Sequence, residues 1–183
     1  MIFPLNTACG LVGDRKMKNS IFALISSCLA GVALAGPLGL EMGTTLSDLK
    51  KITKLEKSDT FKYNTKSLPS GHSGFSDYDL LVTPEHGLCE IVAWTPNIRT
   101  SAYGDDLITL FRRFESSLQA KYGAGKAYDF LRAGSIWTAP RDWMMGLLKN
   151  ERSLAMVWST DAADKLQDNI QKISLKASAL STE

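Results

Sequence analysis

The stretch DYDLLVTPEHGLCEIVAWT, residues 77–95, predicts a β-hairpin. Residues 77–83 are one arm and residues 88–95 are the other. Pro84 presets the backbone angle φ for a turn between the arms, and Gly87 can take the positive φ that such turns require. The second arm is largely apolar on both faces, with Leu88, Val92 and Trp94 on one face and Cys89, Ile91 and Ala93 on the other. Such a strand is expected in the middle of a sheet, covered at least partly on each side.

Four further stretches have the composition or alternation of strands: residues 61–66, 128–137 with a bend near Gly134, 154–158 and 173–179. Helices are predicted over residues 105–122, where apolar side chains recur at helical spacing, and over residues 161–171. A helix also begins after Thr45, which can cap it, and a short one follows Pro140. Together these segments predict an α+β fold: an antiparallel sheet of about five or six strands with helices packed mainly on one face.

The aromatic side chains are expected to belong mostly to the core. The stripe on the 105–122 helix includes Phe111, Phe114 and Tyr122, and core positions are also expected for most of the four tryptophans: Trp94, Trp137, Trp143 and Trp158. Residues 36–183 are long enough to build one such core, so we expect a single globular domain. A strand-like pattern close to Glu183 suggests that the natural sequence continues, unless this strand pairs with an earlier one.

The apolar residues 21–35 are typical of a secretory signal peptide. They follow Lys18 and end in Ala33-Leu34-Ala35, the small-x-small pattern that precedes a cleavage site. Two alternatives stay open: an uncleaved membrane anchor, since residues 19–40 carry no charge and a span needs about 20 residues, and lipidation of Cys28, since residues 25–28 loosely resemble a bacterial lipobox. We expect residues 1–35 to be an upstream extension plus this leader, with Met17 as the true start, and the product to be periplasmic or secreted.

Charge and cysteine content narrow the function further. The chain has a net charge of +2, and loss of Asp14, Arg15, Lys16 and Lys18 with the leader would bring it to zero. No block of like charge remains to indicate binding to nucleic acid or to a membrane surface. Cys89 would be the one remaining thiol, so we expect it buried and without an internal disulfide; an intermolecular disulfide or a reactive thiol is the alternative.

The opening of the domain, Gly43-Thr44-Thr45-Leu46-Ser47-Asp48-Leu49, resembles small exported modules that begin Gly-Met-Ser-x-x-Glu-Val. These are the SmpA/OmlA-type outer-membrane assembly lipoproteins and the β-lactamase inhibitor proteins. Thr45 stands where Ser is more usual, and Asp48-Leu49 stands where Glu-Val is. The resemblance implies helices laid on an antiparallel sheet and a function in binding another protein.

Residues 69–73, Pro-Ser-Gly-His-Ser, match the central motif of the acid phosphatases related to phosphatidic acid phosphatase. In that family the histidine donates a proton during phosphoryl transfer, which makes His72 the one candidate catalytic residue. The family also requires a Lys-x6-Arg-Pro motif upstream and a Ser-Arg-x5-His-x3-Asp motif downstream. This chain has no Arg-Pro pair, and Asp79-Leu80 precede His86 where Ser-Arg is required. The simpler interpretation of residues 67–76 is a polar surface loop.

No other motif in the sequence indicates a nucleophile, a phosphate-binding loop or a metal site. Phe75 replaces the last glycine of a Gly-x-Ser-x-Gly elbow, and Ala120 and Ala127 occupy two defining positions of a P-loop. His72, His86, Cys89 and Glu90 are a conceivable metal site, but they lack the paired ligand spacing of zinc sites. We therefore expect no metal and no cofactor.

The sequence favours an exported bacterial protein that binds another envelope protein or a small ligand and is not an enzyme. The alternative is a phosphatase-like hydrolase that uses the His72 loop, and a third interpretation is a scaffolding role within a longer chain. An enzyme should show His72 in a cleft beside a second titratable group and an anion-binding donor, whereas a binding module should show it exposed and alone. A membrane contact is expected only through an uncleaved leader or a lipidated Cys28.

Overall fold

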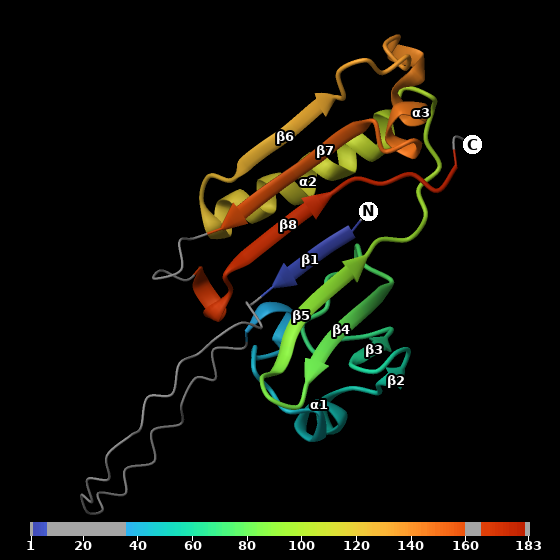
Figure 1. The fold of residues 1–183 in the computed structure, drawn as a ribbon. Helices are drawn as coiled ribbons and strands as arrows, with labels where there is room; N and C mark the ends of the chain where they lie inside the picture. Colours follow the sequence, from blue (N-terminus) through green and yellow to red (C-terminus); the bar gives the residue numbers. More distant parts are fainter. Residues whose placement is uncertain (1, 7–35, 160–165, 182–183) are drawn as a thin grey trace, which may run out of the picture.

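Eight strands and three helices make up the part of the chain that the structure describes (Figure 1). This computed structural model describes residues 2–6, 36–159 and 166–181, except for the side chains of residues 2–6 and Asn169. The strands are β1 (Ile2–Asn6), β2 (Glu56–Lys57), β3 (Lys62–Thr65), β4 (Asp77–Thr83), β5 (Gly87–Trp94), β6 (Lys126–Leu131), β7 (Arg152–Ser159) and β8 (Lys172–Lys176). The helices are α1 (Leu46–Ile52), α2 (Asp105–Tyr122) and α3 (Trp143–Leu148), with 3-10 turns at Pro37–Gly39, Pro140–Asp142 and Gln167–Asn169.

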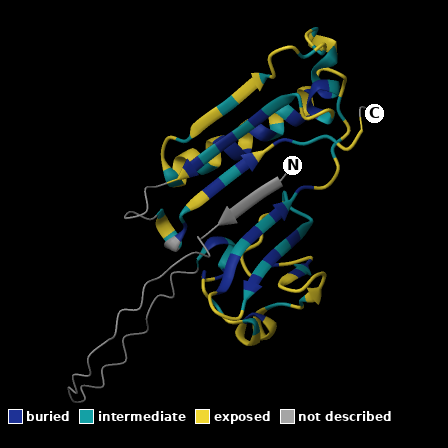
Figure 2. Cartoon of the chain, in the orientation of Figure 1, coloured by how far each residue is buried: buried dark blue, intermediate teal, exposed yellow. Residues whose placement is uncertain are grey.

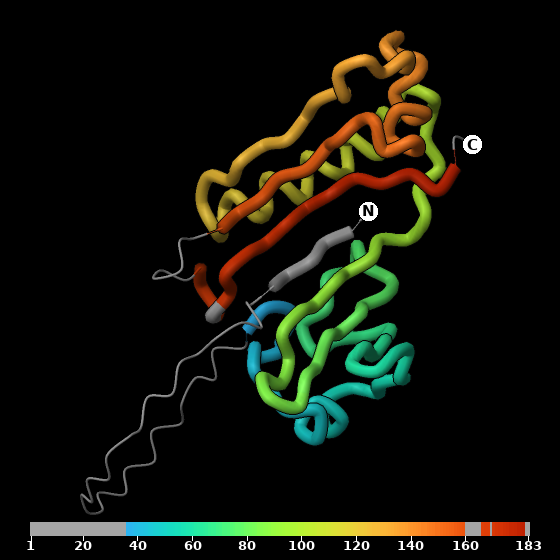
Figure 3. The backbone as a smooth tube through the Cα atoms, in the orientation of Figure 1, coloured from blue at the N-terminus to red at the C-terminus, as the bar shows by residue number. Residues whose placement is uncertain are grey.

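The strands form one antiparallel sheet in the order β2-β3-β4-β5-β1-β8-β7-β6 (Figure 1). β1 pairs with β5 on one side and with β8 on the other. It thereby joins a four-stranded half, β2 to β5, to a three-stranded half, β6 to β8. The connection from β5 to α2 passes from the first half to the second (Figure 3). The α+β class is as predicted.

The core lies between one face of the sheet and the helices (Figure 2). Burial alternates along the strands: Ile91 and Ala93 of β5 and Ile173 and Leu175 of β8 are buried, while their neighbours are partly or fully exposed. The helices contribute Leu49, Leu107, Phe111, Phe114, Met144 and Leu147 to the same core. The prediction of helices mainly on one face is therefore confirmed.

The hairpin of β4 and β5 follows the prediction closely. Gly87, at the end of its turn, has a φ of 66°, and a Cβ atom there would lie 2.2 Å from the carbonyl oxygen of Gly43. The approach is close because the Gly43 amide donates to the Leu88 carbonyl at 2.8 Å and the Leu88 amide donates to the Thr44 carbonyl at 2.9 Å. Only glycine fits the position.

The hairpin also contains a bulge that was not predicted. The register shifts between Leu81 and Val82, so Val82 pairs with Leu88. Since residues paired across an antiparallel ladder share a face, Leu88 joins Val82 in the core. β5 lies between β4 and β1, which confirms that it is an inner strand.

The two predicted helix starts are also confirmed. The hydroxyl of Thr45 accepts a hydrogen bond from the Asp48 amide at 3.3 Å and donates to the Asp48 carboxylate at 2.8 Å. α2 has the predicted limits. Glu115 of α2 is charged but only 8% exposed, and its carboxylate pairs with Arg112 at 2.7 Å.

Several sequence predictions need correction. All six predicted strands form, but β1 and β2 bring the described sheet to eight. β6 ends at Leu131, because residues 132–135 turn with the Ser135 amide donating to the Arg132 carbonyl. Of the predicted 161–171 helix, residues 166–171 form instead a 3-10 turn closed by a Leu166–Ile170 bridge, and residues 160–165 lie outside the described residues. Trp158 is buried, whereas Trp94, Trp137 and Trp143 are only partly buried.

The N-terminal predictions fall mostly outside the described residues: the apolar stretch 21–35, Met17 and Cys28. β1 is an exception, since it lies within the residues expected to be an upstream extension. Cys89 is 2% exposed, as predicted, but it is disulfide-bonded. The prediction of no disulfide was wrong for this chain because it assumed the loss of Cys9 and Cys28, neither of which lies within the described residues. No helix in the described ranges is long and apolar enough to span a membrane.

Candidate functional site

The loop between β3 and β4 holds His72 against the start of the domain and against α2. Its backbone is folded by three hydrogen bonds: the Gly71 amide donates to Leu68, the Phe75 amide donates to His72, and the Ser70 amide donates to Leu38. Leu68 is buried and fixes the loop to the core. The prediction of a surface loop is confirmed, since residues 69–73 are exposed, and the loop is also folded and bonded to Leu38.

Gly74 allows the loop to lie directly on α2. Its amide donates to Nδ1 of His72 at 2.9 Å. A Cβ atom at Gly74 would lie 2.8 Å from Cζ of Phe114 and 3.0 Å from Nδ1 of His72, closer than real Cβ contacts. A larger residue would require the Phe114 ring, the His72 ring or the loop to shift.

His72 is exposed and contacts two aromatic rings. Phe75 and Phe114 stack with their centroids 4.9 Å apart and their planes 16° from parallel. The His72 ring meets both edge-on, at 5.8 Å from Phe75 and 5.5 Å from Phe114. These are favourable aromatic geometries, and they hold the imidazole in one orientation.

A concavity of about 190 Å³ opens beside this cluster, and we call it the His72 hollow. It lies where the loop, residues 37–38 and the C-terminal half of α2 meet. Most of its wall is apolar. Its lining residues are Pro37, Leu38, His72, Phe75, Phe114, Ser117, Leu118, Lys121 and Tyr122.

Three polar groups in the wall have defined partners. Nδ1 of His72 accepts from Gly74, so a neutral imidazole carries its proton on Nε2, which is then a donor. The Ser117 hydroxyl donates to the Arg113 carbonyl at 3.0 Å and keeps its lone pairs for accepting. The Lys121 ammonium lies 2.8 Å from the Asp168 carboxylate.

These contacts and burial shift the pKa values of two groups in the wall, Tyr122 and Lys121. Burial raises the pKa of Tyr122 above its ordinary value, so its phenol is neutral near pH 7. Burial alone would lower the pKa of Lys121, but hydrogen bonds to Asp168 and Tyr122 outweigh burial and leave that pKa above its usual range. The hollow thus presents a paired cation, Lys121, and a neutral phenol, Tyr122.

Phosphoryl transfer requires more than this wall contains. The lining, over the described residues, has no carboxylate, no arginine and no second histidine. Lys121 is the one cation there, and it is already paired with Asp168. His72 therefore lies beside two titratable groups, as an enzyme would require, but without the nucleophile and anion-binding donors of the phosphatase motif.

The other residues considered as ligands do not come together with His72. His86 lies in the β4–β5 turn, where its backbone amide donates to Thr83 Oγ1 at 3.2 Å. Cys89 lies at the bulge of β5, where its Sγ is 3.6 Å from Thr83 Oγ1, and it is disulfide-bonded. Within the described ranges, no group of three or more His, Cys, Asp or Glu residues could hold a metal ion.

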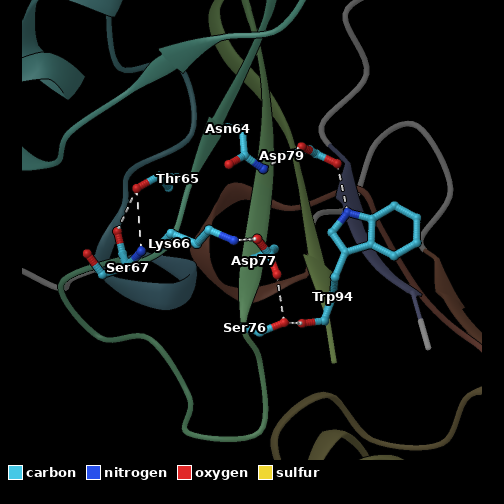
Figure 4. Close-up of polar contacts among 8 residues, drawn as sticks. All are labelled: Asn64, Thr65, Lys66, Ser67, Ser76, Asp77, Asp79 and Trp94. Atoms are coloured by element: carbon cyan, nitrogen blue, oxygen red, sulfur yellow. Dashed lines mark hydrogen bonds and ion pairs between the residues drawn. The ribbon is translucent and has the colours of Figure 1, made fainter. Parts of the chain in front are cut away.

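A second polar cluster, on the face of the sheet away from the helices, is structural (Figure 4). The Trp94 indole donates to Asp79 at 2.7 Å, and the Asn64 amide donates to the other Asp79 oxygen at 3.1 Å. Lys66 pairs with Asp77, which also accepts from Ser76. Because these groups satisfy one another across β3, β4 and β5, they brace the sheet rather than form a binding site.

Phe75, Lys121 and Tyr122 were missed as site residues. Helical spacing correctly placed Phe114 toward the core, but it does not show where the core ends along the helix. No sequence signal marks the contact of Leu38 with the loop, because it joins segments about 30 residues apart.

Comparison of the chain with protein-family models, with curated proteins and with solved structures finds no match.

Proposed function

We propose that this protein is a non-enzymatic binding module and that the His72 hollow takes a small, mostly apolar ligand. The observation that carries the proposal is the wall of stacked Phe75 and Phe114 with His72 set edge-on to both. An apolar cavity of about 150 Å³ is large enough to bind benzene. At about 190 Å³ the hollow suits a ligand with one ring or a short alkyl chain.

The polar groups of the wall favour one hydrogen-bonding group on that ligand. Nε2 of His72 donates when the ring is neutral, and the Ser117 oxygen accepts. A ring hydroxyl matches both, because it is a donor and an acceptor. We therefore propose a single-ring aromatic compound with a hydroxyl group as the ligand class, for which phenol is a simple probe.

The binding test is calorimetric titration of the full-length chain with phenol. A dissociation constant of about 0.1–1 mM is expected for so small a ligand. Ser117→Phe fills the hollow and should weaken binding at least about tenfold. Ser116→Phe is the matched control, because Ser116 is exposed on the neighbouring position of α2 and does not line the hollow. Equal affinities of the two variants, or no saturable binding, would contradict the proposal.

A location in the cell envelope is part of the same proposal. It is supported by the charge, apolar centre and small-residue exit of residues 15–35. Intact mass of the protein recovered from the envelope should correspond to residues 36–183. A full-length protein recovered from the cytosol would contradict export.

The phosphatase-like alternative keeps one observation in its favour, because His72 shares the hollow with the cationic Lys121. Hydrolysis of a generic aryl phosphate by the purified chain, abolished by His72→Gln and unaffected by His86→Gln, would establish it. We expect no hydrolysis.

A further inference from the structure

A second and larger concavity lies at the end of the sheet where β5 and β8 finish. It has a volume of about 370 Å³ and lies between the connection of residues 95–100 and the C-terminal residues 178–181, which Figure 3 traces in lime and red. We call it the Arg99 groove. Its volume falls within the range of about 300–1,000 Å³ that is usual for small-molecule sites, whereas the His72 hollow is smaller.

Arg99 gives the groove its charge. It is the one charged residue of the lining within the described ranges, and no carboxylate lines the groove there. Arg112 and Arg152 have carboxylate partners, but no described residue forms an ion pair with Arg99. A guanidinium stays protonated throughout the working pH range. Among the described residues, the positive charge of the groove therefore has no ion-pair partner.

The groove has an apolar floor beside this charge. Leu107 of α2 is 4% exposed and Met144 of α3 is 7% exposed. Ile98 and Ala179 pack against the same core from the two sides. Thr100, by contrast, is engaged in capping, since its hydroxyl accepts from the Asp106 amide at 3.1 Å. A ligand that uses the floor must carry an apolar body.

We propose that the Arg99 groove binds a small amphiphilic carboxylate, with its carboxylate on the Arg99 guanidinium and its alkyl or ring body on Leu107 and Met144. A guanidinium matches a carboxylate in a planar, two-point geometry, which makes this pair stronger than a neutral hydrogen bond. The site is separate from the His72 hollow and takes the opposite class of ligand, an anion rather than a neutral ring.

Calorimetric titration of the full-length chain with decanoate tests the proposal, with decanamide as the neutral ligand of the same length. Decanoate should bind at least about tenfold more tightly than decanamide, because charge-assisted pairing is lost in the amide. Arg99→Gln should reduce decanoate affinity to that of the amide. Arg113→Gln is the matched control, an exposed arginine of α2 that lines neither concavity, and it should leave the affinity unchanged.

Two further variants separate this site from the hollow. Ser178→Trp should block decanoate by filling the groove, whereas Ser117→Phe, which fills the His72 hollow, should not affect it. No saturable decanoate binding, equal binding of acid and amide, or loss of binding in Ser117→Phe would overturn the proposal. If Arg99→Gln fails to fold, the comparison of acid with amide on the unchanged protein decides it.

Discussion

Gly74 is the residue on which the shape of the His72 hollow depends most directly. Gly74→Ala brings a methyl group to within 2.8 Å of Phe114 and 3.0 Å of His72, so one of these rings or the loop must shift. We expect a loss of about 1–3 kcal/mol in the free energy of unfolding, which is usual for overpacking, together with weaker phenol binding. Urea denaturation measures the first effect and calorimetry the second.

Ser73→Ala is the control for Gly74→Ala, since Ser73 is exposed and adjacent in the same loop. It should change stability by less than about 0.5 kcal/mol. Equal stabilities of Gly74→Ala and Ser73→Ala would mean that the loop does not rest tightly on the helix.

Gly87 is constrained for a different reason, because both its φ of 66° and the carbonyl of Gly43 exclude a side chain. We expect Gly87→Ala to cost about 2 kcal/mol or more, since a left-handed backbone and a backbone clash add. Glu85→Ala, in the same turn and exposed, should be close to neutral. A stable Gly87→Ala protein, by thermal unfolding, would show that residues 43–44 are not held against the hairpin.

At the scale of the element, the titratable groups at the C-terminal end of α2 lead us to expect a lower free energy of unfolding in alkali. The pKa values of Tyr122 and Lys121 are both raised in the folded state, so folding holds their protons more tightly than the unfolded chain does. This contribution is complete below about pH 10 and is lost as the pH rises through the folded values. The free energy of unfolding should therefore fall as the pH rises above about 10.

Tyr122→Phe is the matching variant for the alkaline loss. It removes one of the two titrations and should make the decline shallower, with Tyr78, whose pKa burial also raises, accounting for part of what remains. Urea denaturation at a series of pH values measures the slope. An unchanged slope in Tyr122→Phe, or stability that increases with pH, would contradict the account of this helix end.

The elements also show which predictions the sequence can support. The β4–β5 hairpin and α2 were predicted to within a residue because their signals are local: strand composition, helical spacing, Pro84 and Gly87. β1 was missed because its pairing with β5 and β8 joins residues that are far apart in the chain, and β2 is only two residues long. The motif singled out His72 only as the candidate catalytic residue of the phosphatase alternative, and the hollow beside it depends on Leu38 and α2, which no local pattern connects to the loop.

At the scale of the whole molecule, cleavage of a signal peptide would remove the N-terminal residues, whereas the observed fold uses some of them in the sheet. Cleavage after Ala35 would remove β1, which joins the two halves of the sheet, and would also remove Cys9 and Cys28. A processed chain would therefore lack the strand that pairs with both β5 and β8. It would also lack the other two cysteines, so Cys89 would have no disulfide partner within the chain. The intact mass of the protein recovered from cells would show whether residues 1–35 are retained.

The disulfide of Cys89 determines how many free thiols the full-length chain has, and free thiols can be counted. The chain has three cysteines, and one disulfide leaves a single free thiol. Titration with a thiol reagent in denaturant, without reductant, should find one thiol per chain, and three after reduction. Three thiols before reduction would show that Cys89 is free.

The central claim is that the His72 hollow is a ligand site, and the two histidines of the chain provide its most direct test. His72 lines the hollow, whereas His86 lies in the β4–β5 turn and serves as an internal control. Phenol should be titrated into the full-length chain at constant pH while the imidazole resonances of both are followed by NMR. We predict a saturable shift of the His72 signals with the His86 signals unmoved. Equal shifts of the two histidines, or no saturable shift of His72, would contradict the claim.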